Sequence, residues 1–192
     1  MLTRTGTQLL FPTRLVRFAL DAPALDAAIG AQILERSRTI PSMRRGERTG
    51  WQSANDLFQW SPETGALGKL VADAVMSAHD HTLHEIALFG WANLFTRGVY
   101  FNPHVHADSA WSGVYYLDAA DSGDDAGGML MLRDPRAGAG MTIADSNGFD
   151  SASAYEVRPH TGELVIFPAW LLHWVTPYQS DRPRISVAFN AR

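Results

Sequence analysis

The sequence predicts a mainly β protein, of the α+β class, with helices in its N-terminal part. From Ile86 onward the chain consists of short β-rich runs separated by turns, with no helical run between them, which is typical of an antiparallel barrel or sandwich. Before Ile86, two runs have the apolar spacing of helices. A length of 192 residues suits one sizeable core. We therefore expect a single domain, with an N-terminal part at residues 1–85 and a β core at residues 86–192.

The expected elements begin with a strand and a helix. Residues 9–20 mix β-forming and charged residues and predict a first strand that is interrupted near Pro12. Asp21 or Asp26 offers an N-cap for a helix that continues to about Arg38, because its apolar residues recur at helical spacing.

A loop and a second helix precede the β core. Residues 44–53 are charged and contain glycine, which indicates an exposed loop. Pro62 suits the first turn of a helix that we expect to end near His79. Strands are then expected at residues 86–95, 100–106, 113–118, 129–133, 154–158, 163–167, 173–177 and 185–190. We expect residues 44–53 and the polar, glycine-rich residues 136–150 to select the substrate at the mouth of the β scaffold.

The composition excludes several classes of function. The chain has no cysteine, so disulfides, zinc-thiolate sites and a cysteine nucleophile are excluded, and any metal is held by imidazole and carboxylate. A net charge of −4 without a basic run argues against nucleic acid as a partner. No apolar run approaches the roughly 20 residues of a membrane span, and the N-terminus lacks the features of a secretory signal. We therefore expect a cytoplasmic protein without a membrane partner.

The clearest functional pattern is a cluster of potential metal ligands. His104, His106 and Asp108 follow one another at a spacing of two, and on an extended strand all three project from the same face. Two histidines and one carboxylate are the usual protein ligands of a non-haem iron that must leave positions open for substrate and dioxygen. His173, far downstream, is the best additional ligand, and it requires two distant strands to lie side by side.

Two polar residues beyond His173 suit a carboxylate ligand. The guanidinium of Arg184 can hold a carboxylate through two parallel hydrogen bonds, and Ser186 shares its strand face. Each residue also has a structural interpretation. Arg184 suits a surface pair with Asp181, His173 suits a satisfied core histidine, and Asp108 suits the first position of a turn.

Taken together, these residues resemble the iron(II)- and 2-oxoglutarate-dependent oxygenases with a double-stranded β-helix core. The run Phe95-x-x-Gly98-x-x-Phe101-x-Pro103-His104-x-His106 is similar to the Tyr-x-x-Gly-x-x-Tyr-x-Pro-His-x-Asp run of the prolyl-4-hydroxylase-like branch. A group of small oxygenases, whose substrates are mostly unassigned, is similar in the motifs Ser112-Gly-Val-Tyr-Tyr, Asp134-Pro-Arg, Phe167-Pro-x-Trp-Leu-x-His and Arg184-Ile-Ser-x-x-Phe-Asn. The resemblance covers residues 86–192 and is loose before them.

The resemblance implies a jelly-roll, cupin-like barrel on which the N-terminal helices pack. It also implies a dioxygenase that uses Fe(II) and 2-oxoglutarate, with ascorbate in support, and hydroxylates a substrate with release of succinate and CO2. In the register of the branch, His104, His106 and His173 hold the metal, which gives a centre of three histidines. Sliding the register by two residues makes His106 and Asp108 the ligands, and the sequence leaves both registers open. Arg184 is implied to hold the distal carboxylate of the cosubstrate, together with Ser186.

The remaining site residues are more loosely defined. Asn93, on the strand before the cluster, is expected either to bond the C1 carboxylate of 2-oxoglutarate or to serve a structural role. One or two of Trp111, Tyr115 and Tyr116 are expected to line the pocket, and the others to fill the core. The substrate is a small molecule or a peptide that the sequence does not identify, and the oligomeric state is equally open.

Two other readings of the function and two weaker motifs complete the prediction. A cupin-like dioxygenase with three histidines needs no 2-oxoglutarate, in which case Arg184 binds a carboxylate of the substrate itself; a non-catalytic jelly-roll binding module is the other alternative.

His79, His81 and His84 also have the spacing of metal ligands, but they stand at the predicted end of a helix, where solvated histidines are common. Gly138-Ala-Gly140 lacks the strand-turn-helix context of a nucleotide-binding loop and indicates a flexible turn.

Overall fold

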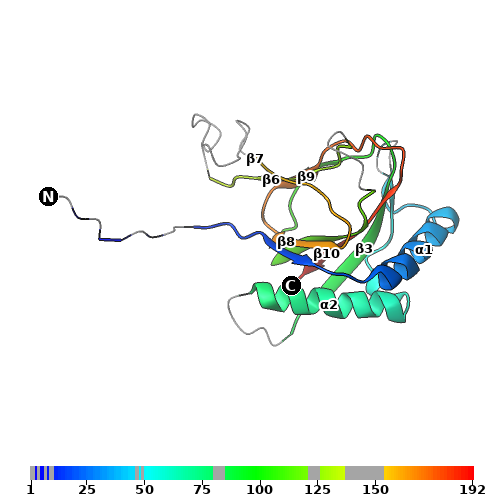
Figure 1. Cartoon of the computed structure of the whole chain (residues 1–192), viewed down its shortest axis with the longest axis horizontal. Coiled ribbons are helices and arrows are strands. Elements are labelled where there is room, and N and C mark those ends of the chain that lie inside the picture. The colour runs from blue at the N-terminus through cyan, green and yellow to red at the C-terminus, as the bar shows by residue number, and fades with distance from the viewer. Residues whose placement is uncertain are drawn as a thin grey trace.

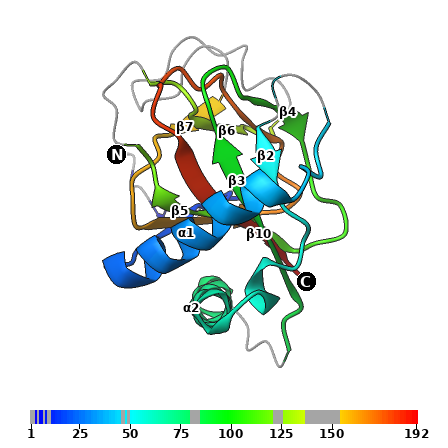
Figure 2. The ribbon, with the colours of Figure 1, turned by 90° about the vertical axis from the view of Figure 1, so that its right-hand side faces the viewer.

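The protein consists of two facing antiparallel sheets with two helices on one side (Figure 1). The computed structural model describes residues 3, 5–6, 8, 11–45, 48, 50–79, 85–120, 126–136 and 154–192. Within these residues, a six-stranded sheet has the order β1-β8-β5-β10-β3-β2, and a four-stranded sheet has the order β4-β9-β6-β7. Both helices lie against the outer side of the larger sheet, as Figures 1 and 2 show. The predicted double-stranded β-helix with helices packed on it is confirmed.

The elements fall close to their predicted positions. The strands are β1 (Val16–Ala19), β2 (Trp51–Gln52), β3 (Leu88–Phe95), β4 (Phe101–His104), β5 (Trp111–Asp118), β6 (Leu130–Arg133), β7 (Ala154–Val157), β8 (Glu163–Pro168), β9 (His173–Val175) and β10 (Arg184–Ala191). The helices are α1 (Pro23–Thr39) and α2 (Pro62–Ala78), with a short 3-10 helix η1 (Leu57–Gln59) between them. Neither α1 nor α2, the helices of the described residues, has the length and apolarity that a membrane crossing requires.

The predicted loop at residues 44–53 is wrong in its last part, because Trp51 and Gln52 pair with β3 and form β2, the edge strand of the larger sheet. Gly50 makes this pairing possible. Its φ is +62°, and a Cβ atom there would lie 2.5 Å from the carbonyl oxygen of Leu94 on β3. Only glycine combines this left-handed conformation with such a close approach of two backbones.

The two helices begin differently. Ala22 is the N-cap of α1, and it makes no side-chain cap hydrogen bond, so the predicted cap by Asp21 or Asp26 is wrong. The carboxylate of Asp26 instead accepts a hydrogen bond of 2.8 Å from the Tyr115 hydroxyl. At α2, the Ser61 side chain and Thr64 form a reciprocal capping box. The first strand is also shorter than predicted, with β1 beginning only at Val16.

The larger sheet uses its two faces for different purposes. On β10, Ile185, Val187 and Phe189 belong to the buried cluster that joins the sheet to the helices. The alternate residues Arg184 and Ser186 face the interior between the two sheets and line a cavity there. Because side chains alternate along a strand, one run of eight residues supplies both a helix-packing face and a pocket face.

Two of the weaker sequence motifs fall wholly or partly outside the described residues. His81 and His84 belong to one of these segments, and Gly138 and Gly140 to the other. Residues 137–150 of the connection expected to select the substrate are likewise outside the description.

Candidate active site

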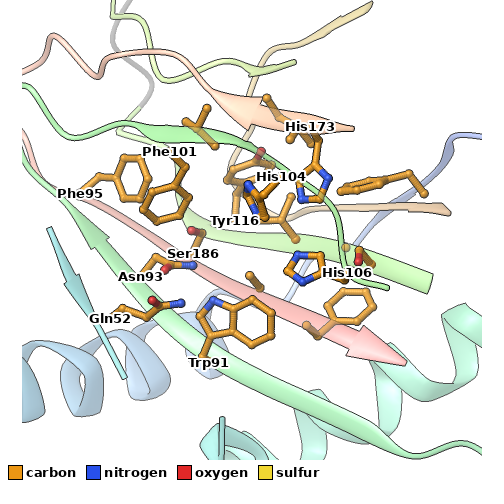
Figure 3. A pocket seen from close by; sticks show the side chains of 18 of the residues that line it. Gln52, Trp91, Asn93, Phe95, Phe101, His104, His106, Tyr116, His173 and Ser186 are labelled. Atoms are coloured by element: carbon orange, nitrogen blue, oxygen red, sulfur yellow. The ribbon is translucent and has the colours of Figure 1, made fainter. Parts of the chain in front are cut away.

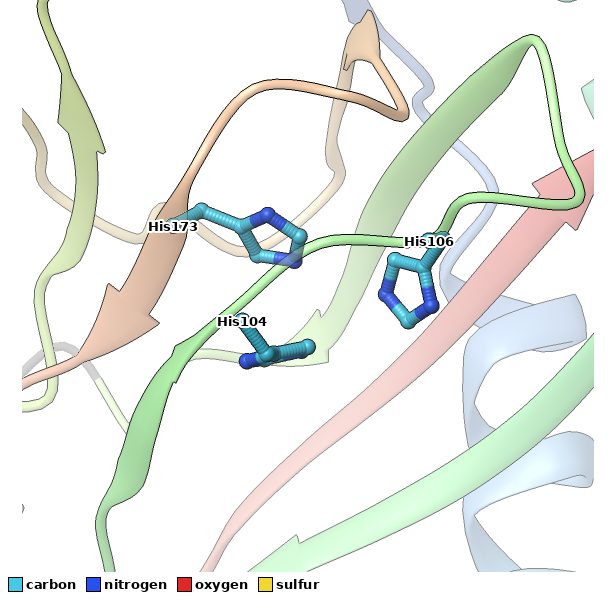
Figure 4. A group of neighbouring side chains, drawn as sticks. All are labelled: His104, His106 and His173. Carbon is cyan, nitrogen blue, oxygen red and sulfur yellow. The ribbon is translucent and has the colours of Figure 1, made fainter.

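Three histidines meet at one end of the cavity between the sheets. His104 ends β4 and lies opposite His173 of β9 in the antiparallel pairing, and His106 follows in the loop (Figure 4). The ring centroids of His104 and His173 are 4.3 Å apart, and the other two pairs are 5.1 and 5.3 Å apart. One ring nitrogen of each histidine lies within 4.8 Å of those of the other two. Among the described residues, this is the one group of histidines and carboxylates whose geometry could hold a metal ion.

Backbone hydrogen bonds fix how two of these rings present their nitrogens. The Nδ1 of His104 lies 2.7 Å from the carbonyl oxygen of Asn102, and the Nδ1 of His173 lies 2.8 Å from that of Leu171. A carbonyl oxygen only accepts, so the proton is on Nδ1 and the lone pair is on Nε2. This is the tautomer that a metal-ligating imidazole needs, and the carbonyls also restrict ring rotation.

The three imidazoles are held in the neutral form. Burial, with a smaller contribution from the neighbouring His104 and His106, lowers the pKa of His173 to about 4. Burial is also the main cause that lowers the pKa of His104, with the charge of Arg44 adding to it. For His106, burial and His104 lower the pKa, and Asp108 acts in the opposite direction. Neutral imidazole is the form that binds a metal, so the site needs no proton release at neutral pH.

The structure does not bring Asp108 into this group. The extended strand assumed in the sequence analysis ends at His104, and the amide of Ser109 bonds the carbonyl of His106 at 3.3 Å to close a turn. Asp108 lies exposed in that turn, where its carboxylate accepts a hydrogen bond of 3.3 Å from the Ser109 hydroxyl. The three-histidine register therefore fits the geometry better than the register that uses Asp108.

Arg184 is a buried cation with no anionic partner among the described residues. The side chain is only 3% exposed, and its Nη1 donates to the carbonyl oxygen of Gly128. The guanidinium carbon lies 4.4 Å from the ring centroid of Phe95 and 5.2 Å from that of Tyr178. Its Nε is buried without an acceptor. Burial lowers the pKa of Arg184, which is the expected effect on a cation without a counter-ion.

Two further residues bear on the buried position of Arg184: Gly128 leaves room for its guanidinium, and Asp181 pairs with another arginine. Gly128 has a φ of +68°, and a Cβ atom there would lie 2.5 Å from Nη1 of Arg184. Glycine thus leaves the space that the guanidinium occupies. Asp181, the predicted surface partner of Arg184, instead pairs with Arg97 at 2.7 Å.

A row of polar side chains crosses the cavity face of the larger sheet. Gln52 of β2 lies opposite Asn93 of β3, Asn93 lies opposite Ser186 of β10, and Ser186 lies opposite Tyr116 of β5 (Figure 3). All four line the cavity. The Oδ1 of Asn93 is buried without a hydrogen-bond donor. Burial raises the pKa of Tyr116 to about 12, so its hydroxyl stays protonated.

The cavity has a volume of about 170 Å³, and both the histidines and Arg184 line it. Of the three aromatic residues expected there, only Tyr116 does so. Trp111 and Tyr115 project from the opposite face of β5 to Tyr116, and they belong to the cluster between the sheet and the helices. Gln52 and Gly128 were not among the predicted site residues. A signal exists for Gly128, because the Gly127-Gly128 pair favours positive φ angles, but none marks Gln52.

His79, the described member of the second histidine motif, is not near this site. It caps the C-terminal end of α2, and its ring lies edge-on to Trp111 with 6.2 Å between centroids.

Residues 90–190, more than half of the chain, match the family described as "Putative 2OG-Fe(II) oxygenase". The chain belongs to this family. The predicted resemblance to 2-oxoglutarate-dependent oxygenases is therefore confirmed. No curated protein matches the chain in sequence.

Solved structures agree with this oxygenase family in fold. A prolyl-4-hydroxylase from Pseudomonas putida superimposes with a TM-score of 0.66 at 20% identity, covering 93% of this chain and 91% of the other. HygX from Streptomyces hygroscopicus, with nickel and 2-oxoglutarate bound, gives 0.67 at 14% identity, covering 93% and 82%. A prolyl hydroxylase from Trichoplax adhaerens, in complex with a peptide fragment of hypoxia inducible factor, gives 0.66 at 13% identity, covering 92% and 82%.

The part of the chain that matches the oxygenase family includes most of the site, but not all of it. Residues 90–190 contain the three histidines, Asn93, Arg184 and Ser186. Arg44 and Gln52, which also line the cavity, come from the segment before this match.

Proposed function

We propose that this oxygenase uses Fe(II) and 2-oxoglutarate to hydroxylate a substrate, with release of succinate and CO2. One observation supports the proposal most strongly: three neutral imidazoles and a buried guanidinium without a counter-ion line the same cavity. His104, His106 and His173 would hold the iron. The complex of HygX with nickel and 2-oxoglutarate supports this assignment, because it places a metal and the same cosubstrate in this fold.

The residues of the cavity floor fit a dicarboxylate cosubstrate. The unpaired Nε of Arg184 offers a hydrogen bond to the distal carboxylate, which would also provide the missing negative charge. Ser186 is only 4% exposed and adds a hydroxyl on the same strand face. Asn93 of β3, opposite Ser186, would donate a hydrogen bond from its side-chain amide to the C1 carboxylate.

Bound iron supplies the activation of dioxygen and the oxidation of the substrate. The chain's own contribution is orientation and exclusion of water. The carbonyls of Asn102 and Leu171 hold two imidazoles in the required tautomer. Phe95, Phe101 and Phe167 line the cavity with apolar surface, which strengthens the polar contacts made within it.

Succinate release from 2-oxoglutarate, measured with Fe(II) and ascorbate, tests the proposal. Arg184→Gln should weaken 2-oxoglutarate binding at least tenfold while iron binding stays within about twofold, because in the proposed complex the guanidinium holds the cosubstrate and is not a metal ligand. Arg182→Gln, an exposed arginine two residues earlier, is the matched control and should change neither. Loss of iron binding before loss of 2-oxoglutarate binding in Arg184→Gln would contradict the assignment.

The absence of a carboxylate from the histidine group favours one second candidate. A metal dioxygenase with three histidines that does not use 2-oxoglutarate would bind a substrate carboxylate at Arg184. Normal iron loading without 2-oxoglutarate binding or succinate release would support this candidate, and failure to load any metal would leave a non-catalytic binding module. For the primary substrate we retain a small molecule or a peptide, and the peptide complex of the Trichoplax adhaerens enzyme supports the latter.

A further inference from the structure

A second guanidinium, that of Arg44, lines the same cavity. Its carbon lies 4.1 Å from the ring centroid of Phe101. It is also near enough to His104 for its charge to act on that imidazole. The side chain is half-buried, and no hydrogen bond or ion pair holds its guanidinium among the described residues. Burial lowers the pKa of Arg44, so an anion beside it would be stabilising.

The backbone fixes Arg44 relative to the cavity. The hydroxyl oxygen of Ser42 accepts hydrogen bonds from the amides of Arg44 (3.2 Å) and Gln52 (3.1 Å). The amide of Met43 bonds the carbonyl of Gln52 at 2.9 Å. Since Gln52 pairs with Asn93 on β3, these bonds tie Arg44 to the larger sheet. Figure 3 shows the amide of Gln52 in the same cavity.

The two guanidinium groups stand on opposite members of an aromatic pair. Phe95 and Phe101 contact edge to face, with 4.8 Å between their centroids. Arg184 stacks on Phe95, at 4.4 Å, and Arg44 stacks on Phe101, at 4.1 Å. The cavity therefore offers two separate cationic positions, and neither has an acidic partner among the described residues. In the function proposed above, the cosubstrate uses Arg184 and the iron for its two carboxylates, so Arg44 is left for another anion.

We propose that Arg44 and Gln52 bind a carboxylate of the primary substrate. This inference rests on the proposed function, and it defines the substrate as an organic acid, either free or as part of a peptide. The guanidinium can hold a carboxylate through two parallel hydrogen bonds, and the amide NH2 of Gln52 offers a further donor. An anion at this position also offsets the free-energy cost of burying the Arg44 cation, so recognition of the substrate depends on its charge as well as its shape.

The test uses protein loaded with Ni(II) and 2-oxoglutarate, in which nickel stands in for iron and no turnover occurs. The probes are aliphatic and aromatic monocarboxylic acids, α-amino acids, and N-acetyl dipeptides with a free C-terminus, each paired with its primary amide. Binding is measured by isothermal titration calorimetry. We expect at least one class of acids to bind tenfold or more tightly than the amides, and the class that binds tells free acids from peptides.

Arg44→Gln should remove this preference for the acid, and Arg45→Gln, the exposed neighbour, should keep it. The inference is overturned if no acid binds, if the amides bind equally well, or if Arg44→Gln retains the preference. It is also overturned if Arg44→Gln loses 2-oxoglutarate binding, since Arg44 would then hold the cosubstrate. Absence of succinate release by the unmodified enzyme with Fe(II) would contradict the proposed function instead, so the two failures are distinguishable.

Discussion

Acidification of the metal-free protein should destabilise it through His173. Burial lowers the pKa of this imidazole from the usual 6.5 to about 4. Above pH 6.5 the imidazole is neutral in both the folded and the unfolded chain, and its burial has no protonation cost. As the pH falls from 6.5 towards 4, the unfolded chain gains a proton that the folded protein does not. Each pH unit in this window then lowers the free energy of unfolding by about 1.4 kcal/mol, which gives about 3 kcal/mol in total.

Urea denaturation at pH 7 and pH 4.5, with metal removed by chelation, measures this effect. The unmodified protein and His160→Gln, in which an exposed histidine is replaced, should lose the same stability between the two pH values. His173→Gln should lose about 2–3 kcal/mol less, because it has no imidazole to protonate. His104 and His106 also have lowered pKa values, so some pH dependence should persist in this variant. A parallel loss in His173→Gln and the unmodified protein would refute the reasoning.

Three further predictions concern single residues. Gly128→Ala should weaken 2-oxoglutarate binding at least tenfold in a titration, because the new methyl group displaces Arg184. Gly98→Ala, which also has a positive φ but no atom near the new methyl, should lose only about 1–2 kcal/mol of stability and keep that affinity; equal affinities in the two variants would contradict the prediction. Asp108→Asn should leave iron affinity within about twofold, and a tenfold loss would restore Asp108 as a ligand. Ser61→Ala should lower the free energy of unfolding by about 1 kcal/mol in urea, through loss of the capping box at α2, and an unchanged midpoint would show that the cap contributes nothing.

The strands were predictable because alternation is a local property of the sequence. Ile185, Val187 and Phe189 alternate with Arg184 and Ser186, and this pattern alone indicates a strand with one apolar and one polar face. The start of α2 was predictable from another local feature, because proline suits the first turn of a helix and Pro62 stands there. The alternation does not say which face of β5 meets the helices, and for that reason the sequence did not tell which one or two of Trp111, Tyr115 and Tyr116 would line the pocket.

The meeting of His173 with the histidines of residues 104–106 was predicted, but two other features of the site were not. Whether the near pair of ligands is His104 with His106 or His106 with Asp108 depends on the turn after β4, which breaks the period of two within a few residues. The place of Gln52 in the cavity depends on its pairing with Asn93, a residue of another strand. Such pairing follows from the tertiary fold and leaves no periodic trace in a segment of two residues.

The position of β2 has a consequence for how the proposed substrate site could be altered. The three histidines and Arg184 are supplied by the β core, whereas Arg44 and Gln52 reach the cavity from the separate segment that contains β2. The carbonyls that orient His104 and His173 belong to Asn102 and Leu171, so a change at Arg44 or Gln52 removes neither hydrogen bond. If the proposed roles hold, replacing Arg44 and Gln52 should change which substrate binds while the proposed metal site stays the same.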